Sequence, residues 1–285
     1  MLDPERVAVL ARIDELERQG IFDQDVEEDP PGETILPGTV DYKQSKLSTK
    51  IKAKIAFSSA RKYLNKIVAD GTLRVKKIHG IEHLDNLTTG AVITCNHFNA
   101  MDSFAMQVAY EASTCHKKRK LFRVIREGNY TSFPGFYGML MRSCNTLPLS
   151  SNMAAMKEML DGVDYHLKRG HLVLIYPEQS MWWNYRKPKP LKRGAFIFAA
   201  KAGVPVIPIF ICQEDSSDIG QDGFPIQEMT IFVLDPIYPD TSVHPIIASQ
   251  ALMEANYAAW KKTYEDFYGK KLEYLCGDPF KKAKA

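Results

Sequence analysis

A histidine and a carboxylate lie five positions apart in the stretch from Asn96 to Asp102, and this pair could carry out acid–base chemistry. A carboxylate that holds an imidazole in one tautomer serves a general base as its orienting acid. Within one regular helix five residues turn through about 500°, so His97 and Asp102 would point about 140° apart. They can meet only if His97 lies in a turn after a strand and Asp102 lies in the next helical turn. The alternative interpretation is a core histidine beside a helix-capping aspartate.

Other chemistries have less support in the chain. No Gly-x-Ser-x-Gly or Cys-x-x-Cys motif is present. A metal-dependent hydrolase using His97, Asp102 and Glu178 is conceivable, but only one of the seven histidines lies in a motif, and zinc-ligand spacing is absent. The five cysteines share no metal or disulfide spacing, which indicates reduced thiols in a cytoplasmic protein. We therefore expect no metal.

Composition narrows the class of protein. A chain of 285 residues, 45% hydrophobic and 25% charged, can form one large globular domain with an appendage or two small domains. A net charge of +3 is too small to imply a nucleic acid partner. No secretory signal pattern opens the chain. The longest apolar stretch, residues 195–212, is interrupted by a lysine and two prolines, so we expect no membrane span.

Charge is distributed unevenly along the first quarter of the chain. Residues 1–35 carry eleven Asp or Glu against three Arg, whereas residues 43–69 carry seven Lys and one Arg and no acid. A basic helix with a partial apolar stripe over 46–69 fits a membrane-surface helix, although a solvated face is the usual meaning of such a pattern. The aromatic and basic residues at 181–187 are typical of a segment at the membrane surface, and they could equally line an acceptor pocket. The acidic segment could mask the basic helix or form a solvated peripheral helix.

Hydrophobic periodicity predicts the elements that must position these residues. Helices are expected over 5–20, 46–69, 101–113, 134–142, 153–168 and 245–268, with a linker at 29–38. Strands are expected over 73–78, 91–95, 121–125, 146–149, 171–176, 204–211 and 228–235. The predicted fold is α/β, with a mixed, largely parallel sheet flanked by helices and an N-terminal helical appendage. We place the boundary between a helical region, 1–70, and an α/β domain, 71–285.

Polar residues follow three of these strands directly. Asn96 and His97 follow one strand, Arg126 follows a second, and Glu178 follows a third. Because ligands bind beyond the carboxyl ends of parallel strands, these side chains are expected to converge on one site.

Four blocks of sequence, in order, resemble the glycerophospholipid acyltransferase family, whose best-known members acylate 1-acylglycerol 3-phosphate. The family's Asn-His-x-x-x-x-Asp matches Asn96 to Asp102, and its strand ending in a basic and an acidic residue resembles 124–127. Its Phe-Pro-Glu-Gly-Thr-Arg block is partly matched at 176–181. Its Lys-Lys/Arg-Gly-Ala-Phe and Ala-Gly-Val-Pro-Val-x-Pro segments are matched at 192–196 and 202–208. The resemblance covers roughly residues 91–211.

This resemblance implies transfer of a fatty acyl group from a thioester, acyl-CoA or acyl-carrier protein, to a hydroxyl of a lysophospholipid, glycerol-phosphate-type or glycolipid acceptor. His97 would be the general base, oriented by Asp102, and no cofactor would be needed. Substrate-binding residues would be Asn96, Arg126, Glu178, Ser180, Lys192 and Arg193. The enzyme would act at an anionic membrane surface, peripheral on the cytoplasmic face. The alternative is a non-catalytic lipid-binding protein on the same fold.

Two departures from the family bear on the acceptor. Met181 replaces the arginine that ends the glutamate block, and Ser150-Ser151 stands where the family has an arginine after a strand. Guanidinium groups grip phosphate oxygens bidentately, so their loss puts a phosphomonoester acceptor in doubt. Either nearby cations replace them or the acceptor is neutral. The candidate cations are Arg142, Arg186, Lys192 and Arg193.

Overall fold

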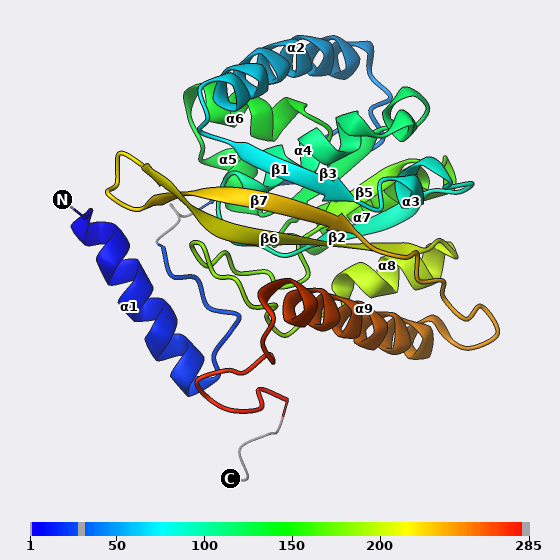
Figure 1. Ribbon diagram of the computed structural model, residues 1–285. Coiled ribbons are helices and arrows are strands. Elements are labelled where there is room, and N and C mark those ends of the chain that lie inside the picture. Colours follow the sequence, from blue (N-terminus) through cyan, green and yellow to red (C-terminus); the bar gives the residue numbers. More distant parts are fainter. Residues whose placement is uncertain (1, 28–31, 281–285) are drawn as a thin grey trace.

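A seven-stranded sheet forms the centre of the protein, with helices on both of its faces (Figure 1). The computed structural model describes residues 2–27 and 32–280. The strand order is β1-β7-β6-β2-β5-β3-β4, and every neighbouring pair is parallel except the antiparallel pair β6 and β7. The predicted fold class, a mixed and largely parallel sheet flanked by helices, is confirmed.

The strands are β1 (Arg74–His79), β2 (Ala91–Cys95), β3 (Leu121–Ile125), β4 (Thr146–Pro148), β5 (Leu172–Ile175), β6 (Val206–Ile219) and β7 (Pro225–Val233). The longer helices are α1 (Pro4–Gln19), α2 (Leu47–Ala69), α4 (Asp102–Ala112), α6 (Gly135–Ser143), α7 (Met153–Lys168), α8 (Gly194–Ala202) and α9 (Pro245–Tyr268). Short helical turns are α3 (Glu82–Asp85), η1 (Thr114–Lys117) and α5 (Glu127–Thr131).

The two faces of the sheet carry separate cores. One core joins the sheet to α2 and α4, and the other joins it to α7, α8 and α9. All five residues of β2 are buried because helices cover both of its faces, which explains its unbroken apolar sequence. On α7 the inward side is formed by Met159, Val163 and Leu167, whereas Leu160, which helical spacing assigns to that side, is 37% exposed.

The β6–β7 hairpin extends further than the apolar pattern indicates. Strand β6 continues through the polar residues 214–219, which pair with β7 beyond the edge of the core. The expected strand at 204–211 is therefore only the buried half of β6. The predicted linker at 29–38 has its first three residues outside the described part of the chain.

The N-terminal helices pack at different places on the body (Figure 1). Helix α2 lies over α6, whereas α1 lies beside the sheet. Val9, Ile13 and Leu16 of α1 share a small core with Trp182 and Trp183, so these tryptophans are 0% and 8% exposed. The expectation that the 181–187 run faces a membrane or a pocket is therefore wrong for its tryptophans. A boundary near residue 70 between a helical region and an α/β domain stays a proposal.

The acidic segment does not mask the basic helix among the described residues. Its described side-chain ion pairs are made with one another and with the body of the protein, and none reaches a lysine of α2. Two of these body contacts involve Arg126 and Lys192, at the edge where the candidate site lies. The acidic segment therefore pairs with cations of the body rather than with the basic helix α2.

Candidate active site

The turn between β2 and α4 brings His97 and Asp102 together. Strand β2 ends at Cys95 and α4 begins at Asp102, so the geometry required by their spacing is present. His97 Nδ1 lies 2.6 Å from Asp102 Oδ2, and the Asp102 side chain is 1% exposed. The same carboxylate oxygen accepts the backbone N–H of Phe98 at 3.2 Å. Asp102 therefore holds both the imidazole and the turn that carries it.

The orientation of the imidazole leaves one nitrogen for chemistry. Because Nδ1 faces a carboxylate, the proton on this ring belongs on Nδ1, and Nε2 is the nitrogen with a lone pair. The His97 side chain remains 23% exposed. Its ring stacks on that of Tyr176, with centroids 4.2 Å apart and planes 25° apart. The ring is thus fixed from one face and one edge while solvent reaches it.

Glu178 braces two backbone segments. Its side chain is 2% exposed, and its two oxygens accept the backbone N–H groups of His97, at 3.0 Å, and Lys189, at 2.8 Å. The ammonium of Lys189 lies 3.9 Å from the same carboxylate. Burial raises the pKa of Glu178 and lowers that of Lys189 to about 8. Direct binding of substrate, the role predicted for Glu178, does not fit a buried carboxylate that already joins two backbone segments.

Two further predicted substrate ligands are also structural in their contacts. Asn96 is 2% exposed and bonds to both backbone groups of Ile211, which extends the pairing of β2 with β6. Ser180 is 0% exposed and donates to the carbonyl of Phe22. Neither side chain faces a space that a substrate could enter.

The three predicted cations lie at the same edge, each with a partner. Arg126, predicted to bind substrate, bonds to Asp25 and to the carbonyl of Gln179. Lys192 Nζ lies 2.6 Å from Asp23 Oδ2, and Arg193 donates to Gln250 at 2.8 Å. The sequence motifs identified these three cations as site residues, but no local pattern predicted their partners.

Residues that the sequence analysis missed complete the site. Lys189 donates to the carbonyl and hydroxyl oxygens of Ser180, at 2.6 and 2.8 Å, beneath the loop that carries Glu178. Tyr176 begins a block that matches the family, which could have drawn attention to its ring. Lys189 has no such signal, since a single lysine in a Lys-Pro run is typical of an exposed loop.

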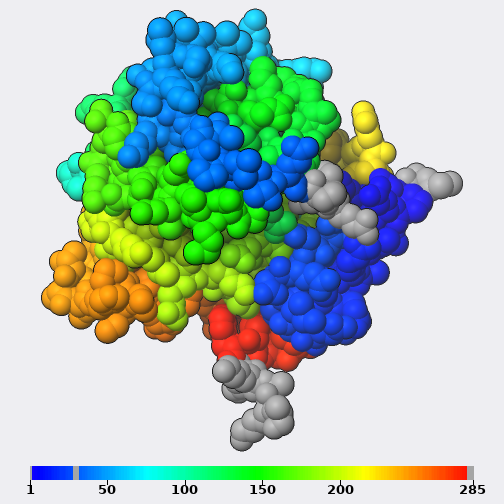
Figure 2. All heavy atoms as spheres, turned by 180° about the vertical axis from the view of Figure 1, so that it is seen from behind, coloured from blue at the N-terminus to red at the C-terminus, as the bar shows by residue number. Residues whose placement is uncertain are grey.

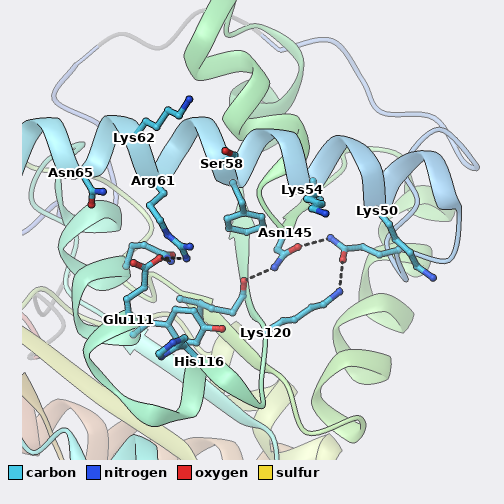
Figure 3. A pocket seen from close by; sticks show the side chains of 16 residues that line it. Lys50, Lys54, Ser58, Arg61, Lys62, Asn65, Glu111, His116, Lys120 and Asn145 are labelled. Carbon is cyan, nitrogen blue, oxygen red and sulfur yellow. Dashed lines mark hydrogen bonds and ion pairs between the residues drawn. The ribbon is translucent and has the colours of Figure 1, made fainter.

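A cavity of about 660 Å³ lies elsewhere, beneath α2 (Figure 3). Most of its lining residues are polar or charged, and they include the cations Lys50, Lys54, Arg61, Lys62 and Lys120. Glu111 pairs with Arg61 at 3.1 Å. Neither His97 nor Asp102 lines this cavity, so it is separate from the catalytic pair.

The central part of the chain matches a known protein family. Residues 75–212 match a family described as Acyltransferase. These residues form an acyltransferase domain. The matched stretch runs from β1 into β6 and contains His97, Asp102 and Glu178, so the family resemblance found in the sequence motifs is confirmed over this stretch.

A solved structure supports the fold of this acyltransferase. The 1-acyl-sn-glycerophosphate (LPA) acyltransferase PlsC from Thermotoga maritima is 18% identical, with a TM-score of 0.51, over 79% of this chain and 81% of that chain. No curated protein matches the chain. In the described residues, no group of His, Cys, Asp and Glu side chains is arranged to hold a metal ion.

Proposed function

We propose that the protein transfers a fatty acyl group from a thioester to a hydroxyl of a lipid acceptor, with His97 as the general base. The observation that carries this proposal is the 2.6 Å contact between His97 Nδ1 and buried Asp102, at the carboxyl end of β2 in an acyltransferase domain. Acyl-CoA or acyl-carrier protein is the proposed donor. No other cofactor is required by this chemistry.

The proposed reaction needs no covalent intermediate on the protein. His97 Nε2 takes the proton of the acceptor hydroxyl as its oxygen attacks the thioester carbonyl. The Asp102 carboxylate stabilises the imidazolium that forms. The tetrahedral intermediate then collapses, the C–S bond breaks, and the imidazolium returns the proton to the departing thiolate. The result is an ester and a free thiol.

Release of thiol from palmitoyl-CoA tests this proposal. Purified wild-type protein and His97→Ala are assayed in detergent micelles with several lysolipid acceptors, and acylated lipid is measured as a second product. Loss of a general base should lower turnover by about two to four powers of ten. Near-normal turnover by a folded His97→Ala variant would rule out the assignment. A protein with no turnover on any acceptor or donor would instead fit the lipid-binding alternative.

A membrane surface is the proposed location of the reaction. No helix among the described residues is both long and apolar enough to span a bilayer. On α2, Leu47, Ile51 and Ile55 form a stripe and are 72%, 52% and 59% exposed. Lys50, Lys52 and Lys54 flank these residues in the sequence of α2, and Lys50 and Lys54 also line the cavity beneath the helix (Figure 3). An exposed apolar stripe among lysines is suited to the surface of an anionic bilayer.

Vesicle sedimentation tests this location. Ile51→Ser/Ile55→Ser should weaken binding to vesicles that contain anionic lipid by about tenfold or more, because two aliphatic side chains no longer enter the bilayer. Ile246→Ser/Ile247→Ser is the matched control, since these residues are 49% and 62% exposed on α9, which lies on the other side of the sheet (Figure 1). Equal losses for both variants would argue against α2 as the membrane contact.

A further inference from the structure

Residues 20–27 lie across the loop that carries Glu178. Ser180 donates to the carbonyl of Phe22 at 2.6 Å, and the Trp182 indole donates to the carbonyl of Gln24 at 2.8 Å. Phe22 stacks on Trp182 with centroids 5.5 Å apart, and Val26 is 0% exposed. Side-chain packing and backbone hydrogen bonds therefore hold this segment at the edge of the active site.

Two carboxylates of the segment meet the two cations that an anionic acceptor would need. Asp25 forms a bidentate pair with Arg126, its oxygens lying 2.5 and 2.9 Å from the two terminal guanidinium nitrogens. Asp23 bonds to Lys192 at 2.6 Å, and this hydrogen bond is the largest cause of the lowered pKa of Asp23. Both carboxylates are thus paired with basic groups.

Three other cations on the same loop are compensated in the same way. Each lies within 4 Å of one carboxylate: Arg186 near Asp215, Lys187 near Glu17, and Lys189 near Glu178. These three carboxylates come from the hairpin, α1 and the loop itself. Arg193, at the end of the loop, donates instead to the neutral side chain of Gln250.

Carboxylate and phosphate compete for the same geometry on a guanidinium group. A phosphomonoester could reach Arg126 only by displacing Asp25, and the displaced carboxylate would then repel it at close range. An uncharged headgroup meets neither obstacle, because its hydroxyls need hydrogen bonds rather than a net positive charge.

We infer that the acceptor of this enzyme has an uncharged headgroup, and that Asp23 and Asp25 exclude phosphomonoester acceptors by occupying Lys192 and Arg126. This inference rests on the proposed acyl transfer. It narrows that proposal to one substrate class, hydroxyl compounds such as a monoacylglycerol. The carboxylates of segment 20–27 thereby occupy the positions that the phosphate of an acceptor would otherwise take.

The test compares two acceptors across a small set of full-length variants. Initial rates with palmitoyl-CoA are measured for monoacylglycerol and for lysophosphatidic acid in the same micelles, giving the ratio of their kcat/KM values. Wild type should favour monoacylglycerol. Asp23→Asn/Asp25→Asn should raise the relative value for lysophosphatidic acid about tenfold or more, the size of a charge-assisted hydrogen bond regained. Asp14→Asn, an exposed acid on α1, is the matched control and should leave the ratio unchanged.

Several outcomes would overturn the inference. A wild-type preference for lysophosphatidic acid would do so, and so would an unchanged ratio in a double variant whose melting temperature shows that it is folded. His97-dependent thiol release separates this failure from failure of the proposed function, which would show no such release with either acceptor.

Calorimetry with glycerol 3-phosphate then decides the point without turnover. Binding to the double variant but not to the wild type supports the inference. Binding to the wild type, or to neither protein, contradicts it.

Discussion

Asp102→Asn separates the catalytic role of this carboxylate from its structural role. An asparagine of the same shape can still accept the N–H groups of His97 and Phe98 through its amide oxygen, because both partners are donors. The neutral ground state of the site should therefore persist. What disappears is the negative charge that faces the imidazolium in the transition state.

The size of the effect follows from Coulomb's law. Two unit charges about 4 Å apart interact by about 4 kcal/mol at an effective dielectric constant of about 20. Since each 1.36 kcal/mol changes a rate by about tenfold, kcat should fall about 10³-fold. The loss of an acidic residue from the first turn of α4 costs only about 0.5 kcal/mol of unfolding free energy. Activity and stability should thus respond very differently to the same substitution.

Steady-state thiol release at saturating donor and acceptor measures kcat, and a urea titration measures unfolding free energy. If Asp102→Asn remained folded and kept a kcat within tenfold of wild type, the electrostatic argument would be refuted. Asp102 would then serve to hold the turn before α4 through the N–H of Phe98.

Three further predictions concern stability. Burial lowers the pKa of His166 to about 4, so the unfolded chain binds its proton first, and unfolding free energy should fall by up to about 3 kcal/mol between pH 6.5 and 4. His166→Gln should flatten that acid limb in urea titrations. Lys189→Met should cost about 3 kcal/mol in thermal melts, since it leaves Glu178 buried without its cation. Phe22→Ala should cost about 3 kcal/mol and speed proteolysis near residue 20.

Each of these predictions has a contrary result. An unchanged acid limb in His166→Gln would assign the pH dependence to other groups. A Lys189→Met variant as stable as wild type would mean that Glu178 is protonated in the folded state. If Phe22→Ala melted earlier without faster cleavage near residue 20, the N-terminal segment would unfold together with the body rather than before it.

The catalytic pair could be predicted because its geometry is local. A buried strand, a short turn and a helix start all lie within twelve residues, 91–102, and their apolar and polar pattern specifies each of them. Strand β2 was likewise predictable from a short apolar run, since all five of its residues are buried. The local pattern of apolar and polar residues was therefore sufficient to predict those elements whose structure depends on burial alone.

The partners of the charged residues could not be predicted from local pattern. Arg126 and Asp25 lie 101 positions apart, and Lys192 and Asp23 lie 169 apart. In the sequence of one protein each charge has many possible partners. The packing of Phe22 on Trp182 and the hydrogen bonds from Ser180 and Trp182 to residues 22 and 24 select among them. For the same reason Trp182 and Trp183 were assigned to a membrane or pocket, although α1 covers them.

Glu17 of α1 has a consequence for the order in which the protein is assembled. Its Oε1 atom accepts Lys187 at 2.5 Å and the backbone N–H of Leu275 at 3.1 Å, so one buried oxygen joins three distant segments. During synthesis α1 emerges first, but its main apolar partners, Trp182 and Trp183, emerge much later, and Leu275 later still. Until the two tryptophans have been added, the apolar side of α1 lacks these partners, and the segment that carries Asp23 and Asp25 is not held in place. Completion of the active site is therefore a late event in the biosynthesis of this chain.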